Sequence, residues 1–94
     1  MYHQLTNSKG DKLFILTVVS TNDIQPMIRV DTWEKCLDLF NSHTTEQDTE
    51  RFFAQLIHKD IKEGNVEASM RCNRKGWGFD YFKYLTIKPL YITE

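Results

Sequence analysis

The sequence predicts a small α+β domain in which an antiparallel sheet packs against a pair of helices, in the order β-β-β-α-α-β-β. Three observations carry this prediction. Short apolar or alternating segments occupy the first and last thirds of the chain. Apolar residues recur at helical spacing in the middle third. The length of 94 residues suits one domain that spans residues 1–94. Helices set apart from strands in this way are typical of α+β folds.

The first third predicts a three-stranded meander. Turn-forming residues at 7–11 and 20–23 separate three segments, residues 2–6, 13–19 and 24–30. Residues 13–19 are almost continuously apolar and rich in β-branched side chains. This pattern predicts a central strand that is buried on both faces. Pro26 confines the third segment to a sheet edge or a bulge.

The first predicted helix begins near residue 31. Asp31 and Glu34 have the spacing of a capping box, with Asp in the N-cap position. An apolar stripe follows at i, i+3, i+4 and i+7, and residues 41–42 end the helix. The stripe consists of Trp33, Cys36, Leu37 and Phe40.

A second helix is expected to begin at Thr44 or Thr45 and to end at Gly64. Acidic residues in its first turns suit the positive end of the helix dipole. They could instead present charge to a basic partner. These residues are Glu46, Asp48 and Glu50. The apolar stripe of this helix consists of Phe52, Phe53, Leu56, Ile57 and Ile61.

The last third predicts a hairpin. Apolar and polar residues alternate over 66–72, which is typical of a half-buried strand. Residues 73–76 form a turn, and residues 77–87 return as a long strand. Pro89 interrupts the chain before a short apolar tail at residues 90–92.

Composition limits the classes of function. The formal net charge of −1 gives no bulk attraction to nucleic acids or membranes. No run of about 18 apolar residues is present, so no membrane span is expected. The N-terminus lacks the pattern of a secretory signal, which favours the cytoplasm. In a reducing cytosol Cys36 and Cys72 are expected to be buried thiols.

The stretch from residue 70 to 87 combines a basic turn with a dense aromatic run. Aromatic and Arg side chains are enriched at binding hot spots. The predicted binding residues are Arg71, Arg74, Lys75, Trp77, Phe79 and Tyr81. The alternative is that the aromatic residues pack in the core or form cross-strand pairs, and that the basic residues are a solvated hairpin tip.

Residues 75–82, KGWGFDYF, resemble the ribonucleoprotein octamer of RNA-recognition domains. In that family the aromatic side chains stack on splayed bases from the face of a sheet. Trp77 stands where Phe or Tyr is usual, and Asp80 stands where an aliphatic residue belongs. The twelve residues after Phe82 are too few for the helix and strand that follow the octamer in that family. The resemblance is therefore limited to the eight residues of the octamer and does not extend to the topology of that family.

The sequence predicts neither a metal site, nor a cofactor, nor an enzyme. Its Cys and His residues lack the spacing of a zinc finger. His58 and Asp60 are two positions apart on a predicted helix and would not face each other. No phosphate-binding loop, nucleophile elbow or metalloprotease motif is present.

We therefore expect a non-enzymatic cytoplasmic protein, a small regulator or inhibitor that binds another macromolecule through its C-terminal hairpin or sheet face. A protein partner is favoured, without membrane association. Edge strands could support a homodimer, although Pro26 and Pro89 are placed to blunt such pairing. One alternative is single-stranded nucleic-acid binding through the aromatic and basic hairpin. Another is a small-molecule pocket between sheet and helices.

Overall fold

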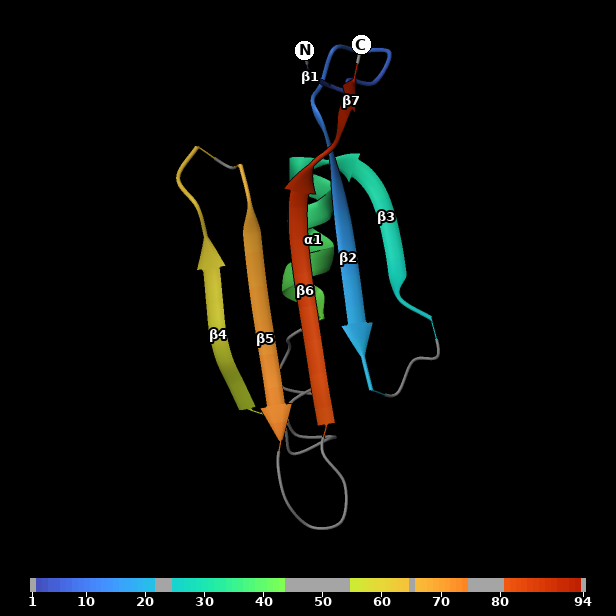
Figure 1. The fold of residues 1–94 in the computed structure, drawn as a ribbon. Helices are drawn as coiled ribbons and strands as arrows, with labels where there is room; N and C mark the ends of the chain where they lie inside the picture. Colours follow the sequence, from blue (N-terminus) through green and yellow to red (C-terminus); the bar gives the residue numbers. More distant parts are fainter. Residues whose placement is uncertain (1, 22–24, 44–54, 65, 75–80, 94) are drawn as a thin grey trace.

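The computed structural model describes residues 2–21, 25–43, 55–64, 66–74 and 81–93. Strands flank a helix in chain order (Figure 1), which confirms the predicted α+β class. Among the described residues one helix is present, so the predicted pair of helices is wrong. The elements are β1 (Tyr2–Gln4), β2 (Leu13–Ser20), β3 (Met27–Thr32), α1 (Trp33–Ser42), β4 (Gln55–Ile61), β5 (Ala68–Arg74), β6 (Tyr81–Pro89) and β7 (Tyr91–Thr93).

Five strands form one antiparallel sheet in the order β3-β2-β6-β5-β4. Figure 1 shows α1 against one face of this sheet, behind β2 and β6. β1 and β7 pair in a separate two-stranded sheet, which places the two ends of the chain side by side. The core lies between α1 and the five-stranded sheet. Its buried residues are Phe14, Leu16, Val18, Cys36, Phe40, Ala68, Met70, Leu85 and Ile87.

β2 lies between β3 and β6, but it is buried on only one face. Phe14, Leu16 and Val18 are buried toward α1, whereas Val19 is 40% exposed on the other side. The prediction of burial on both faces is therefore wrong. A continuous apolar run predicted two covered faces, but α1 covers only one of them. The apolar residues on the second face remain accessible to a partner.

The predicted N-terminal meander is reduced to the β2–β3 hairpin. β1 pairs with β7 rather than with β2. Both long edges of β2 are occupied, by β3 and by β6, so no edge is left for the N-terminal segment. The chain is tied to the sheet at Leu5, whose N–H donates to the Leu90 carbonyl and whose carbonyl accepts from the Leu13 N–H, each at 2.8 Å.

The first helix is confirmed, with a different start. Its N-cap is Thr32 rather than Asp31, and the side chain of Thr32 makes no capping hydrogen bond. Asp31 instead accepts a hydrogen bond from the Thr32 N–H at 2.8 Å. Cys36 and Phe40 are fully buried as the stripe predicts. Trp33 is partly buried against the core, where its ring meets Phe14 edge-to-face with centroids 5.2 Å apart.

The second predicted helix is wrong where the structure describes it. Residues 55–61 form β4, an edge strand that pairs antiparallel with β5, and residues 44–54 lie outside the described residues. The register shifts between Leu56 and His58, so that Ile57 has no ladder partner. Such a bulge inserts one extra residue into one strand of an antiparallel pair without ending the strand. Pairing with β5 therefore overrides the helical spacing of Leu56, Ile57 and Ile61.

The C-terminal hairpin is confirmed as the pair β5–β6. On β5, Ala68, Met70 and Cys72 are buried and Arg71 is exposed, in the alternation that the sequence predicts. The returning strand β6 begins at Tyr81, and residues 77–80 of the predicted strand lie outside the described residues. Cys36 and Cys72 are buried thiols that form no disulfide, as expected.

Candidate functional site

The predicted binding residues divide into three groups. Arg71 is described with its side chain, which is exposed on β5. Arg74 and Tyr81 are opposite each other in the ladder, where β5 and β6 reach the hairpin connection. Lys75, Trp77 and Phe79 lie outside the described residues. The structure therefore places Arg71 on a surface and leaves the other predicted contacts untested.

Arg71 belongs to a face of the sheet that α1 does not cover, which we call the open face. Directly opposed residues of neighbouring strands point to the same side of a sheet. The ladder registers therefore assign the members of this face across all five strands. The open face consists of Ile28 and Val30 of β3, Ile15, Thr17 and Val19 of β2, Phe82, Tyr84, Thr86 and Lys88 of β6, Ser69, Arg71 and Asn73 of β5, and His58 and Asp60 of β4.

Tyr84 lies at the centre of the open face, because β6 is the middle strand of the sheet. Its ladder partners are Val19 on β2 and Arg71 on β5, and Arg71 in turn faces His58 on β4. This row presents an aliphatic, an aromatic, a cationic and an imidazole side chain side by side. Tyr84 is 38% exposed, so its ring is accessible to a partner.

Phe82 extends this surface along β6. It is two residues before Tyr84 and therefore on the same face of the strand. The two rings are nearly parallel, with 6.3 Å between centroids and 15° between planes. They form a short aromatic ladder beside Arg71.

The β3 side of the open face is aliphatic. Ile28 is 59% exposed and Val30 is 46% exposed, and both are adjacent to Thr17 and Ile15 on β2. Isolated exposed aliphatic residues are common on protein surfaces. Ile28 and Val30 lie two positions apart on this face, and Val19 is diagonal to Ile28 across the ladder. Contiguous aliphatic residues of this kind are typical of an interaction surface.

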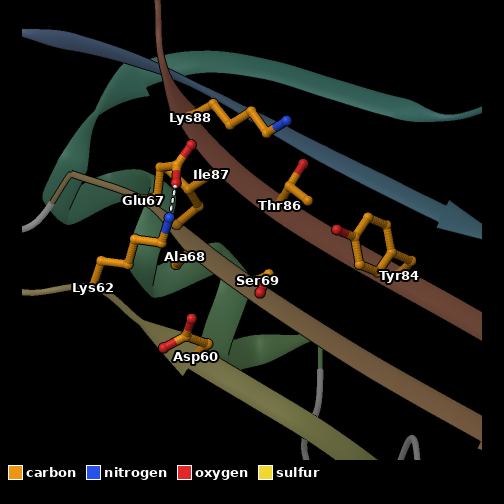
Figure 2. Close-up of a pocket in the computed structure, with 9 residues that line it drawn as sticks. All are labelled: Asp60, Lys62, Glu67, Ala68, Ser69, Tyr84, Thr86, Ile87 and Lys88. Carbon is orange, nitrogen blue, oxygen red and sulfur yellow. Dashed lines mark hydrogen bonds and ion pairs between the residues drawn. The ribbon is translucent and has the colours of Figure 1, made fainter.

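A hollow of about 290 Å³ occupies the β4 side of the open face. Figure 2 shows Tyr84, Thr86 and Lys88 along one side of it, and an ion pair between Lys62 and Glu67. The Lys62 Nζ and Glu67 Oε2 atoms are 2.6 Å apart. This contact raises the pKa of Lys62 and lowers that of Glu67. Both groups are therefore charged, and each offsets the other's field in the hollow.

A second hollow, of about 660 Å³, lies where the turn at residues 7–12 meets the start of α1. The turn is built on Asn7, whose Oδ1 accepts hydrogen bonds from the N–H groups of Lys9 and Asp11 at 2.9 and 3.0 Å. Cations and anions line this hollow in equal number, so it has no marked preference for ligands of either charge. They are Lys9, Lys12 and Lys35, and Asp11, Asp31 and Glu34.

The described cysteines are poorly suited to nucleophilic chemistry. Cys36 is fully buried, and loss of hydration raises the pKa of its thiol above the ordinary value of 9.0. Cys72 is 3% exposed on the core face of β5. Within the described ranges, no group of three or more His, Cys, Asp or Glu side chains is arranged to hold a metal ion.

Sequence reasoning did not assign Tyr84 and Phe82 to the candidate surface, and it missed the aliphatic part of the open face. A signal for Tyr84 was present. From residue 84 to 88 the chain alternates Tyr, Leu, Thr, Ile and Lys, which is typical of a strand with one buried face. This alternation assigns Leu85 and Ile87 to the core and Tyr84 to the exposed side.

No protein-family model, curated protein or solved structure matches this chain. None of the described helices is long and apolar enough to cross a membrane. The open face is therefore the feature from which a function can be proposed.

Proposed function

We propose that this chain is a single, non-enzymatic cytoplasmic domain that binds another protein through its open face and acts as a small regulator or inhibitor. The observation that carries the proposal is the position of Tyr84. An aromatic ring that is 38% exposed lies at the centre of the sheet, between an exposed aliphatic residue, Val19, and a cation, Arg71.

The composition of the open face supports a protein partner. Tyr and Arg are the residue types that most often dominate the energy of protein interfaces. The aliphatic residues Ile28, Val30 and Val19 extend the contact surface on one side of Tyr84. The complementary partner surface has an apolar centre that covers Tyr84 and a carboxylate that reaches Arg71.

The test is capture of a partner by the intact chain, immobilised and exposed to lysate of the cells that produce it. Tyr84→Ala and Arg71→Ala are each expected to weaken binding of the captured protein by more than about tenfold, as hot-spot truncations do. The matched controls are Tyr91→Ala, a tyrosine that is 51% exposed on β7, and Lys35→Ala, an exposed cation on α1. If the Tyr84 variant binds as tightly as the Tyr91 variant, the open face is not the binding surface.

A second candidate is single-stranded nucleic-acid binding, which the Phe82 and Tyr84 rings favour. Parallel aromatic rings beside a cation can stack with successive bases while Arg71 contacts a phosphate. This function predicts that a fluorescent single-stranded oligonucleotide binds at low salt, that salt weakens the complex, and that Tyr84→Ala abolishes it. Absence of binding at low salt would reject this candidate and leave the protein partner.

A further inference from the structure

The outer edge of β3 has two residues whose backbone groups point away from the sheet. The Leu90 N–H donates to the Leu13 carbonyl at 3.2 Å, and the Thr21 N–H donates to the Phe82 carbonyl at 2.9 Å. Along β2, the odd-numbered residues therefore form their backbone hydrogen bonds with β6, and the even-numbered residues form theirs with β3. By the β2–β3 register, the even residues Phe14, Leu16 and Val18 face Asp31, Arg29 and Met27. The intervening Ile28 and Val30 direct their N–H and C=O groups outward.

The row of outward N–H donors along this edge is limited at both ends. Pro26 has no N–H, and the N–H of Thr32 is already donated to the Asp31 carboxylate at 2.8 Å. The N–H donors that β3 offers outward are therefore those of Ile28 and Val30. Their side chains are also the most exposed aliphatic ones of the strand, at 59% and 46%. An exposed edge of this kind is a template for pairing with another strand.

We propose that this edge pairs antiparallel with the β3 edge of a second copy of the chain, with Ile28 of each copy opposite Val30 of the other. In this register both outward residues of each strand donate and accept, and four intermolecular backbone hydrogen bonds form around a two-fold axis at Arg29. A shift by two residues in either direction places an outward residue opposite Pro26 or Thr32, where a donor is missing. The β3 edge is therefore self-complementary in one register.

Charge supports a second copy as the occupant. Arg29 already contacts Asp31 of its own strand, with Nη2 and Oδ2 3.0 Å apart. In the proposed register Arg29 also lies diagonally across from Asp31 of the second copy, within the reach of a long side chain. The charges of two guanidinium groups and two carboxylates then offset one another near the two-fold axis. On the open face, Ile28 and Val30 of the two copies cover one another in two β-branched pairs.

The arrangement leaves room for both helices. The two-fold axis is perpendicular to the sheet, so both copies of α1 lie on the same face of a continuous sheet. α1 lies behind β2 and β6 (Figure 1), and the two copies of β2 are three strand spacings apart, about 14 Å. This exceeds the 8–10 Å typical of packed helices. The short ladder makes a small interface, so we expect a dimer that dissociates on dilution.

The experiment is sedimentation equilibrium of the intact chain over concentrations up to the millimolar range. The expected mass rises with concentration from 11.2 kDa to twice that value. Val30→Pro removes an outward N–H without removing a bond to β2, and it is expected to give a monomer at every concentration. Ile61→Pro is the matched control, because Ile61 is an exposed aliphatic residue on the opposite edge strand, β4. This control is expected to dimerise normally.

A cysteine cross-link tests the register without depending on a proline variant. Arg29→Cys places two thiols opposite each other across the axis, with about 4.5 Å between Cα atoms, which permits a disulfide. Val30→Cys pairs with Ile28 and is expected to remain unlinked under the same mild oxidation. A wild-type chain that is monomeric at all concentrations, a Val30→Pro variant that still dimerises, or failure of Arg29→Cys to cross-link would each overturn the proposal. Tyr84 and Arg71 lie on β6 and β5, away from the paired edge, so the Tyr84→Ala and Arg71→Ala variants test the proposed partner surface separately from the dimer.

Discussion

The ammonium group of Lys83 donates a hydrogen bond to the backbone carbonyl of His43 at 2.7 Å. Lys83 is only 7% exposed and lies on the core face of β6, where its neighbours Leu85 and Ile87 are fully buried. His43 is the C-cap of α1. Carbonyl groups at a helix C-terminus carry partial negative charge, which a cation stabilises. This contact joins the end of the helix to the middle strand of the sheet.

Lys83→Met is expected to lower the free energy of unfolding by about 2 kcal/mol, because the aliphatic stem is kept while a hydrogen bond from a charged donor is lost. The control is Lys88→Met, which changes an exposed lysine on the open face of the same strand and should cost less than about 0.5 kcal/mol. Urea denaturation measures both values. Equal losses in the two variants would contradict a stabilising contact between Lys83 and His43.

Phe40→Ala is expected to cost about 3–5 kcal/mol, because Phe40 is fully buried between α1 and the sheet and its loss leaves a cavity. A domain of this size has a total stability of roughly 5–10 kcal/mol, so this variant should unfold far more readily. Asp38→Ala changes an exposed residue of the same helix and is the control. A loss below about 1 kcal/mol for Phe40→Ala would show that the helix does not pack as described.

The lowered pKa of Asp31 predicts that the fold loses stability in acid. The Thr32 N–H, and secondly the Arg29 guanidinium, lower the pKa of Asp31 below its ordinary value of 3.8. Because the pKa of Asp31 is lower in the folded state than in the unfolded state, the ionised carboxylate stabilises the fold above pH 3.8. This stabilisation is lost as the pH falls through the pKa of the folded state. The difference in stability between wild type and Asp31→Asn should therefore shrink below pH 3.8. Chemical denaturation across this range measures it, and high salt should remove only the Arg29 part. A constant difference would contradict the lowered pKa.

Gly10 adopts φ +85 in the turn at residues 7–11, and no heavy atom lies within 4 Å of a Cβ placed there. Gly10→Ala is therefore expected to cost about 1–2 kcal/mol from backbone strain alone. Gly10→Asn should cost less, since Asn tolerates the left-handed region. Thermal unfolding of the two variants checks this order. If Asn is as costly as Ala, the left-handed backbone conformation is not what limits the position.

The resemblance of residues 75–82 to the ribonucleoprotein octamer stays a prediction for most of its length. In the described part, Tyr81 and Phe82 begin β6, and residues 75–80 lie outside the described residues. The aromatic residues that the structure does place on the open face are Phe82, at the end of the octamer, and Tyr84, beyond it. The predicted strand over residues 77–87 is therefore confirmed from Tyr81 onward, and the aromatic positions before it stay a prediction.

The elements whose local pattern has one interpretation were predictable from the residues alone. The alternation of Ala68, Met70 and Cys72 predicted β5, and the helical spacing of Trp33, Cys36 and Phe40 predicted α1. In these segments the apolar period and the final burial agree. The Tyr84 side of β6 was predictable from the same alternation.

The other elements and the exposure of each face depend on packing between distant parts of the chain. Residues 55–61 have a helical apolar stripe, but they pair with the edge of β5 and form the fifth strand of the sheet, with a bulge at Ile57. Residues 13–19 are almost continuously apolar, and only the position of α1 decides that Val19 stays exposed while Val18 is buried. Strand pairing and face coverage depend on residues distant in sequence, so no local period encodes them. The open face, on which the proposed function depends, is the side of the sheet that α1 does not cover.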